Sequence, residues 1–233
     1  GRPKLSLADM IFCCVFKTYS TFSGRRFTGD MTIAKDSGLI QKVPHYNSIF
    51  NYLQNPKLTP LLNDFIQQSS LPLKSIETDF AVDSSGFTST RYARWLDFRY
   101  GKKEGSLRVW LKAHLMCGVK TNVVTSVEVT EGKAADTPML PELVIRTAQN
   151  FTINEVSADK AYSSRENYDV IGKVNGKGYI PFRSNATGSS KGSYLWKKMF
   201  HYFMYNREEF MQHYHKRSNV ETTFHMIKSK FGT

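Results

Sequence analysis

The sequence predicts an α/β protein in which a mixed sheet is flanked by helices and preceded by a helical N-terminal region. Two observations carry this prediction. Apolar residues recur at helical spacing up to about residue 72, and from Ser75 onward short apolar runs bounded by turn residues replace them. After Ser75 the expected order is three strands, then helix, strand, helix, strand and helix. We therefore expect a helical region over residues 1–72 and an α/β domain over residues 73–233.

The composition indicates a globular protein with an anionic partner. The 233 residues suffice for one large domain, alone or with a small appendage, and an apolar share of 40% excludes a disordered chain. Lys and Arg number 32 and Asp and Glu number 20, which gives a net charge of 32 − 20 = +12. A chain this basic favours nucleic acid as its partner, and a basic protein without such a partner is the alternative.

The cysteines and the apolar runs bear on the compartment. Cys13, Cys14 and Cys117 show no metal-binding spacing, and adjacent cysteines rarely pair, so we expect buried free thiols in a reducing compartment. The apolar stretch at residues 9–16 is far too short to span a bilayer, and no signal-peptide cleavage pattern follows it. We therefore expect a cytoplasmic protein without a membrane segment. The missing initial Met and the helical last residues suggest a fragment with a truncated C-terminus.

Three helices are expected in the N-terminal region. They cover residues 5–24, 44–56 and 58–73, where apolar side chains recur every three or four positions. Residues 32–54 have the outline of a helix-turn-helix with its turn at Gly38, a unit that DNA-binding proteins insert into the major groove.

Five strands and two intervening helices are expected in the α/β domain, each bounded by turn residues. The strands are placed at residues 75–87, 107–115, 123–129, 153–164 and 178–182. The helices are placed at residues 136–150, with Asp136 or Thr137 as the N-cap, and at residues 164–176. A loop rich in Gly and Ser then leads to the helical C-terminal part. In this order the first and fourth strands can be neighbours at the centre of a mixed sheet.

Three carboxylates stand out as candidate metal ligands. Asp83 ends the first expected strand, Asp159 ends the fourth, and Glu221 lies inside the last helix. If the two strands are neighbours, their Asp side chains emerge together, and a helix across the strand ends can add Glu221. Anionic oxygen ligands on rigid elements suit hard divalent cations, and two such ions can activate a water and stabilise the leaving oxygen of a phosphodiester. The alternative is that each Asp only forms a turn or caps a helix, and Asp79 is a rival ligand in mid-strand.

The last helix adds a stripe of functional side chains. Asn206 with Glu209 three residues later predicts its start as a capping box. The residues that share one face by helical spacing are Phe210, Tyr214, Arg217, Glu221, Phe224 and Lys228. Arg217 can orient the carboxylate or bind a phosphate through two hydrogen bonds, and Lys228 can bind a phosphate as a point charge. The tyrosine can donate a hydrogen bond or stack. The alternative is an ordinary surface salt bridge within this stripe.

The spacing Tyr-x2-Arg-x3-Glu-x6-Lys, at residues 214, 217, 221 and 228, resembles the Tyr-Arg-Glu-Lys signature of bacterial insertion-sequence transposases of the Asp-Asp-Glu (DDE) type. Four further segments resemble motifs of these transposases: "AVDSSGF" around the first Asp, "VTEGKAADTPML" between the two Asp residues, "ADKAYSS" around the second, and "GYIPFRSNATG" after it. Ala135 stands where relatives often have a His. The likeness extends from about Ser75 to the C-terminus and, more loosely, over the N-terminal helices.

The resemblance implies a ribonuclease H-like catalytic domain that binds two Mg²⁺ ions, with Mn²⁺ as an alternative, through Asp83, Asp159 and Glu221. It implies hydrolysis at transposon ends to free a 3′-hydroxyl, which then attacks target DNA. The partners would be double-stranded DNA, as inverted repeats and as target, and a second copy of the chain in a homodimer on paired ends. The N-terminal helices would bind the transposon ends, and the protein would be associated with the bacterial nucleoid. The interval of 221 − 159 = 62 residues leaves no room for a large inserted domain.

Basic residues are concentrated where DNA would bind. The stretch at residues 86–120 contains eight Lys or Arg residues and two acids. The residues expected to contact DNA there are Arg91, Arg94, Lys102, Lys103, Arg108 and Lys112. Aromatic residues interleave with these cations and can stack on bases, and the alternative is a solvated loop whose aromatic residues pack inward. His114, on the same strand face as Lys112, is expected to be a structural residue.

Two other functions stay open at this point. A nuclease or resolvase with the same core would cut DNA without joining strands. A transposase remnant would serve only as a DNA-binding module. That second function predicts the loss of at least one of the three acids, yet all three are present, although truncation can still leave such a remnant inactive.

Overall fold

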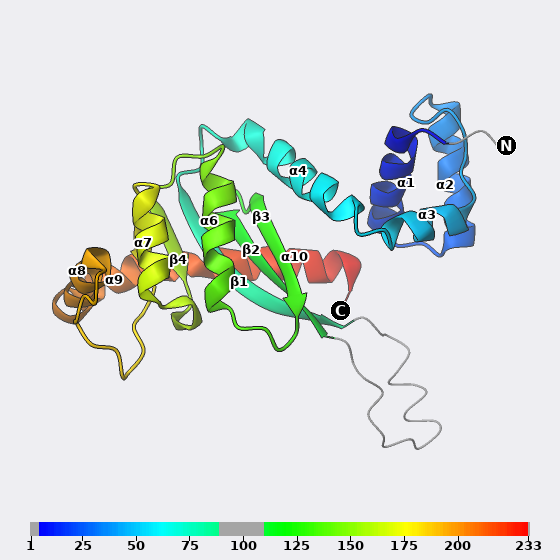
Figure 1. The fold of residues 1–233 in the computed structure, drawn as a ribbon. Helices are drawn as coiled ribbons and strands as arrows, with labels where there is room; N and C mark the ends of the chain where they lie inside the picture. Colours follow the sequence, from blue (N-terminus) through cyan, green and yellow to red (C-terminus); the bar gives the residue numbers. More distant parts are fainter. Residues whose placement is uncertain (1–4, 89–109, 233) are drawn as a thin grey trace, which may run out of the picture. The chain divides into compact units, whose positions relative to one another are not determined.

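A computed structural model of the chain describes residues 5–88 and 110–232 (Figure 1). The chain divides into two compact units, Gly1–Leu62 and Asn63–Thr233. The first unit contains the N-terminal helices and the second contains the sheet. The division falls inside helix α4 (Leu58–Ser70), somewhat before residue 72.

The first unit is a group of short helices around an apolar core of its own. Its helices are α1 (Leu7–Ser20), α2 (Gly24–Asp36) and α3 (Tyr46–Leu53), followed by the start of α4. Serine side chains cap the first two helices, since Ser6 accepts a hydrogen bond from the Asp9 amide and Ser23 accepts one from the Arg26 amide. Apolar residues from all four helices form the core.

The helix-turn-helix outline is only partly reproduced. Residues 37–45 join α2 to α3, with Gly38 in the left-handed region at φ 74°. A helix-turn-helix uses a turn of about three or four residues, so this connection is too long for that motif. Helix α2 was not predicted as a separate element, because polar and basic residues surround its three buried positions, Phe27, Met31 and Ala34.

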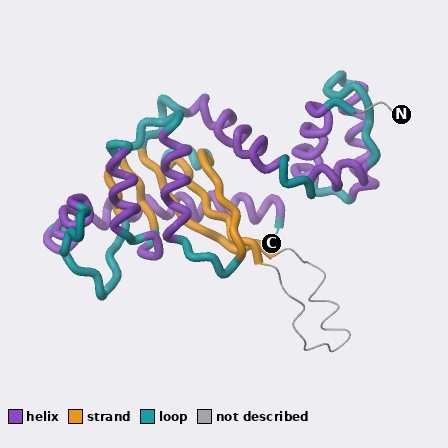
Figure 2. Tube along the Cα trace, viewed as in Figure 1, coloured by secondary structure: helices purple, strands orange, loops and turns teal. Residues whose placement is uncertain are grey.

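The described part of the second unit contains a five-stranded mixed sheet (Figure 2). Its strands are β1 (Asp79–Thr88), β2 (Trp110–Gly118), β3 (Val124–Glu131), β4 (Glu155–Ala158) and β5 (Lys177–Tyr179). Their spatial order is β3-β2-β1-β4-β5, with β1 and β3 antiparallel to β2, and with β4 parallel to both β1 and β5. This is the expected ribonuclease H-like arrangement, and it confirms that the first and fourth strands are neighbours.

Helices cover both faces of the sheet (Figure 1). The α-helices of this unit are α6 (Leu140–Ala148), α7 (Arg165–Lys173), α8 (Tyr194–Tyr205), α9 (Arg207–Tyr214) and α10 (Ser218–Phe231). The 3₁₀ turns are η1 (Leu71–Leu73), η2 (Thr137–Met139), η3 (Lys160–Tyr162) and η4 (His215–Arg217). Phe80 and Val82 of β1 pack with α6 and α7 on one face, whereas Ala81 packs with α10 on the other. Because side chains alternate along a strand, Asp79 and Asp83 belong to the α10 face.

Strand β1 continues past the point where it was expected to end. Asp83 lies in mid-strand, because β2 pairs with β1 as far as Thr88 opposite Trp110. Pairing with β4 stops earlier, at Val82 opposite Ala158. Asp83 is therefore the first residue of β1 beyond the end of β4.

The predicted N-cap positions Asn206 and Asp136 are confirmed, at the starts of α9 and η2, but the predicted capping hydrogen bonds are not. Neither side chain makes a capping hydrogen bond, so the predicted capping box is not formed. The Asp136 carboxylate is instead bound by Ser84 and Lys112. By contrast, α7 begins where it was expected, after Ser164, whose hydroxyl accepts a hydrogen bond from the Asn167 amide.

The expected continuous C-terminal helix is divided by η4. Helix α9 ends at Tyr214 and α10 begins at Ser218, with the tighter 3₁₀ turn between them. This turn packs against β1 and β4. It directs two successive cations, Lys216 and Arg217, to the carboxylates of those strands.

The cysteines behave as expected. Cys13, Cys14 and Cys117 are free and buried, and burial raises the pKa of the Cys13 and Cys117 thiols to about 11. Such thiols are poor nucleophiles at neutral pH. Within residues 5–88 and 110–232, none of the helices has the length and apolar character that a membrane crossing requires.

Candidate active site

Two aspartates meet where the paired strands β1 and β4 end their contact. The parallel register places Val82 beside Ala158, and the next step along both strands places Asp83 beside Asp159. Asp159 keeps an extended backbone, with φ −64° and ψ 155°. Parallel neighbours lie about 4.8 Å apart and direct their side chains to the same face. The register, which ends one residue before both aspartates, agrees with the prediction that their side chains emerge together.

Glu221 reaches this site through Arg217. Arg217 Nη1 lies 2.6 Å from Asp83 Oδ2, and Nη2 lies 2.5 Å from Glu221 Oε1. The side chains of Arg217 and Asp83 are each 19% exposed, whereas that of Glu221 is 55% exposed. The salt bridge that was the alternative interpretation of the stripe therefore forms, and the same guanidinium also binds the first aspartate. Arg217 ties the last helix to the central strand.

The pKa of Asp83 responds to burial and to the charges around it. Burial is the largest influence and raises the Asp83 pKa, while the Ser84 amide, which donates to Oδ1 at 2.8 Å, and Arg217 lower it. Repulsion from Asp159 and from Glu221 raises the pKa further. A group of acids that includes one with a raised pKa is typical of a functional site that takes up a cation.

A second set of charges lies on the same face, four residues earlier on both strands. Lys216 Nζ donates to Asp79 Oδ2 at 2.6 Å and to Glu155 Oε2 at 2.7 Å. His213 Nδ1 lies 2.9 Å from the same Glu155 oxygen. Burial by itself lowers the Lys216 pKa, but the two carboxylates outweigh burial and raise it. Lys216 therefore fastens η4, and with it Arg217, to both central strands.

Asp136 is a site residue whose contacts the sequence did not reveal. Ser84 Oγ donates to Asp136 Oδ1 at 3.1 Å, and Lys112 Nζ lies 2.5 Å from the same oxygen. The Lys112 side chain is 22% exposed, so this candidate DNA contact already has a carboxylate partner. The signal that pointed here was the resemblance of the segment around Asp136 to a transposase motif, because chain distance alone does not predict a contact with Ser84.

His114 is buried in a hydrogen-bonded network next to Asp136. Its Nδ1 lies 3.1 Å from Tyr162 Oη, and its Nε2 lies 3.0 Å from Thr130 Oγ1. Burial lowers the His114 pKa, although Asp136 acts in the opposite direction. The expectation of a structural, satisfied histidine is confirmed.

The remaining predicted residues divide into two groups. Tyr214 packs under Arg217, with 5.9 Å from the guanidinium carbon to the ring centre, and Lys228 Nζ lies 5.3 Å from the ring centre of Phe87. The stripe from Tyr214 to Lys228 thus continues along η4 and α10. The five other cations expected to contact DNA, Arg91, Arg94, Lys102, Lys103 and Arg108, lie outside the described residues.

The donor chemistry of the site suits a hard divalent cation, because its candidate ligands are all carboxylate oxygens. Over residues 5–88 and 110–232, however, no three His, Cys, Asp or Glu side chains lie close enough together to hold a metal ion. Arg217 explains this spacing, since its guanidinium lies between Asp83 and Glu221. A metal ion bound by both Asp83 and Glu221 would therefore have to displace the Arg217 guanidinium from between them.

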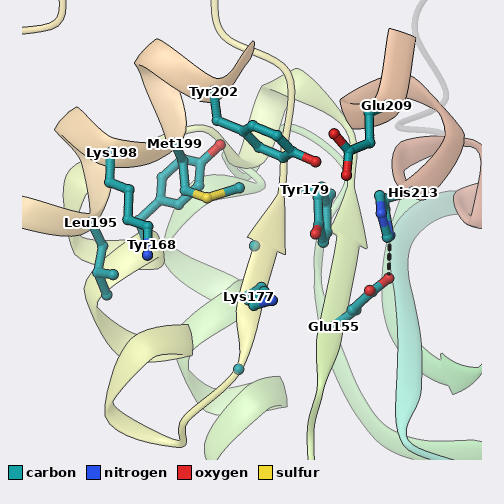
Figure 3. Close-up of a pocket in the computed structure, with 12 residues that line it drawn as sticks. Glu155, Tyr168, Lys177, Tyr179, Leu195, Lys198, Met199, Tyr202, Glu209 and His213 are labelled. Carbon is teal, nitrogen blue, oxygen red and sulfur yellow. Dashed lines mark hydrogen bonds and ion pairs between the residues drawn. The ribbon is translucent and has the colours of Figure 1, made fainter. Parts of the chain in front are cut away.

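A hollow of about 440 Å³ at the β5 edge is separate from the candidate metal ligands (Figure 3). Tyr179 and His213 stack in its wall, with ring centres 4.3 Å apart, and Tyr202 directs its hydroxyl toward Glu209. Glu155, which also binds Lys216, is its link to the charges on the α10 face. None of the three candidate ligands lines this hollow.

The model of the transposase DDE domain family matches residues 74–233, which is more than half of the chain. The chain belongs to the DDE transposase family. The match covers the transposase from the residues before β1 through α10, so it includes both aspartates and Glu221. Members of this family are enzymes that act on DNA with divalent metal ions. Among curated proteins and among solved structures, no match was found.

Proposed function

We propose that this transposase cleaves DNA at transposon ends and joins the freed 3′-hydroxyl to target DNA. The observation that supports the proposal is the contact of Arg217 with both Asp83 and Glu221, at the point where β1 continues beyond its pairing with β4 and Asp159 follows the end of β4. All three lie in the segment that matches the transposase DDE domain. Two Mg²⁺ ions held by these carboxylates would activate the attacking oxygen and stabilise the leaving oxygen of the phosphodiester.

The backbone prepares the two aspartates for this role. The Ser84 amide donates to Asp83 Oδ1 at 2.8 Å, and the Ala161 amide donates to Asp159 Oδ1 at 3.2 Å. One oxygen of each carboxylate is thus fixed by its own chain segment. Side chains held in this way need little reorganisation when a ligand arrives.

Arg217 would exchange a carboxylate for a phosphate. A guanidinium binds both groups through the same planar pair of hydrogen bonds, so the exchange needs no new geometry. When Arg217 binds the phosphate, it releases Asp83 or Glu221, which would then act as a metal ligand. Tyr214 supports the guanidinium, and Lys228 would contact a phosphate farther along α10.

The other parts of the proposal concern DNA and assembly. Lys112 and the five cations at residues 91–108 would contact DNA, and the helical region 1–72 would bind the transposon ends. Two copies would act together as a homodimer on paired ends. The basic balance of 32 Lys and Arg over 20 Asp and Glu supports DNA contacts over a broad surface.

The test is Mg²⁺-dependent cleavage and joining on DNA that carries the inverted repeats flanking the gene. Asp83→Asn, Asp159→Asn and Glu221→Gln are each expected to lose activity by on the order of 10³-fold or more. Glu166→Gln, at an exposed acid in the first turn of α7, is the matched control and should retain activity. Undiminished activity in any of the first three variants would refute the ligand assignment.

The same assay separates the two alternatives. Cleavage without joining by the unaltered chain would indicate a nuclease or resolvase. DNA binding without cleavage would indicate a transposase remnant that serves as a binding module.

A further inference from the structure

Two adjoining hollows lie next to Asp159. Their volumes are about 940 Å³ and about 320 Å³, and Arg183, Asn185 and Ala186 line both of them. We call the combined depression the Arg183 groove. Asp159 lines the larger hollow, and Lys160, the next residue in the chain, lines it as well. The groove therefore begins at a candidate ligand of the active site.

The lining of the Arg183 groove is strongly basic. Its cations are Lys160, Arg165, Arg183, Lys191 and Arg207. Asp159 is the one carboxylate among the described residues that line it. Five positive charges around a concave surface repel one another and attract a polyanion.

None of these five cations forms an ion pair with an acid in the described chain, in contrast to four other cations of the second unit. Lys112, Arg146, Lys216 and Arg217 each bind at least one carboxylate. Arg183 Nη2 instead donates to the Ala161 carbonyl at 3.3 Å, and Arg165 Nε donates to the Ser190 carbonyl at 3.2 Å. Carbonyl bonds orient a guanidinium but leave its full charge uncompensated.

Aromatic rings hold two of these cations in place. The Arg165 guanidinium carbon lies 4.7 Å from the ring centre of Trp196, and that of Arg207 lies 4.9 Å from the ring centre of Phe203. Both rings are buried. Stacked guanidinium groups lose less conformational freedom when they bind a phosphate. The groove thus presents a partly ordered array of phosphate-binding groups.

We infer that the Arg183 groove binds successive phosphates of one DNA strand on one side of the reacting phosphate. The inference rests on the proposed function, since it takes Asp159 as part of the reaction site. Continuity with Asp159 favours the strand under reaction, and unpaired cations spread along a groove favour a repeating polyanion over a single small anion.

The first test compares two triple variants with the same change in charge. The groove variant carries Lys160→Gln, Lys191→Gln and Arg207→Gln, at three exposed residues. The control carries Gln in place of three exposed lysines that do not line the groove: Lys74 and Lys173, which precede β1 and β5, and Lys177, the first residue of β5. Circular dichroism establishes that both variants fold.

Binding of each full-length protein to a fluorescein-labelled duplex of mixed sequence is followed by anisotropy in EDTA, over about 50–200 mM KCl. In the groove variant, the slope of log K against log salt should become shallower by up to about 2.7, because each of the three replaced cations contributes about 0.9. The control slope should change by less than about 1. Equal changes in both variants, or an unchanged slope in the groove variant, would overturn the inference.

The second test locates the DNA. Asn185→Cys places a thiol on the exposed loop of the groove, and because the three native cysteines are buried, a photoreactive thiol reagent should label this position selectively. DNA should crosslink to position 185 and not to a Lys173→Cys control, and absence of a crosslink at 185 contradicts the inference. Both tests use EDTA, so their result is independent of whether the three carboxylates prove to be metal ligands.

Discussion

Lys216→Met is expected to destabilise the second unit by about 2–3 kcal/mol. Lys216 Nζ contacts Asp79 at 2.6 Å and Glu155 at 2.7 Å, so the two carboxylate oxygens are at most 2.6 + 2.7 = 5.3 Å apart. Two charges about 5 Å apart repel by about 3 kcal/mol at an effective dielectric constant of about 20. Met retains the packing of the aliphatic stem but removes the charge that compensates this repulsion.

Because these side chains are partly buried, the expected loss of stability lies between the costs of breaking a buried ion pair and an exposed one. The side chains are 30%, 20% and 15% exposed for Lys216, Asp79 and Glu155. Breaking a fully buried pair costs about 3–5 kcal/mol, and breaking an exposed one costs about 0–1 kcal/mol. For a unit of this size, the corresponding fall in Tm is roughly 5–10 °C.

The assay measures the free energy of unfolding by urea denaturation at neutral pH, and the Tm by thermal denaturation. Because the carboxylates raise the Lys216 pKa, the contribution of Lys216 is complete at pH 7 and is lost only as the pH rises through that raised pKa.

Two control variants test whether the loss of stability comes from repulsion between Asp79 and Glu155. Lys198→Met removes an exposed lysine from α8 and should change stability by less than about 0.5 kcal/mol. Adding Asp79→Asn to Lys216→Met removes one of the repelling charges and should restore part of the loss. A cost below about 1 kcal/mol for Lys216→Met, or a double variant less stable than the single one, would show that the carboxylates are not held against each other.

Asp83→Asn should raise Tm while it removes activity, because burial raises the Asp83 pKa and the charged form is penalised in the folded state. The wild-type chain loses this stability as the pH rises through the raised pKa, so in thermal denaturation the advantage of the variant should be absent in acid and constant above that pKa. Gly118→Ala should destabilise by about 2–4 kcal/mol, since a Cβ there would lie 2.4 Å from the carboxyl carbon of buried Glu77. Gly29→Ala, with no atom within 4 Å in α2, should stabilise by about 0.5–1 kcal/mol, and similar urea midpoint shifts for the two glycine variants would contradict this.

The sheet and the two aspartates could be predicted because their signals are local. Each aspartate follows an apolar run, and the order of strands and helices after Ser75 allows the first and fourth strands to be adjacent, as they are in the sheet. The extent of β1 beyond Asp83 was missed because it depends on pairing with β2, which the residues around Asp83 do not encode. Local patterns thus predict where a strand passes more reliably than where it ends.

The ion pairs of the site could not be predicted from such patterns. Arg217 lies 134 residues from Asp83, and Lys216 lies 137 residues from Asp79. The predicted helical stripe placed Arg217 next to Glu221 correctly, since that pair is four residues apart. The 3₁₀ turn η4, which directs both cations to the strands, packs against β1 and β4. The helical spacing of the sequence continues through these residues, so it does not predict the turn.

Lys216 and Arg217 are neighbours in the chain but have different consequences for the protein. The Lys216 ion pairs stabilise the fold, whereas the Arg217 ion pairs involve the candidate metal ligands. Lys216 anchors η4 to a carboxylate pair that the proposed reaction does not use, while its neighbour binds the pair that the reaction does use. Loss of the Arg217 contacts therefore leaves the turn fastened. In the proposed reaction we therefore expect a rotation of the Arg217 side chain to release the acids, while the Lys216 contacts keep the backbone of η4 in place.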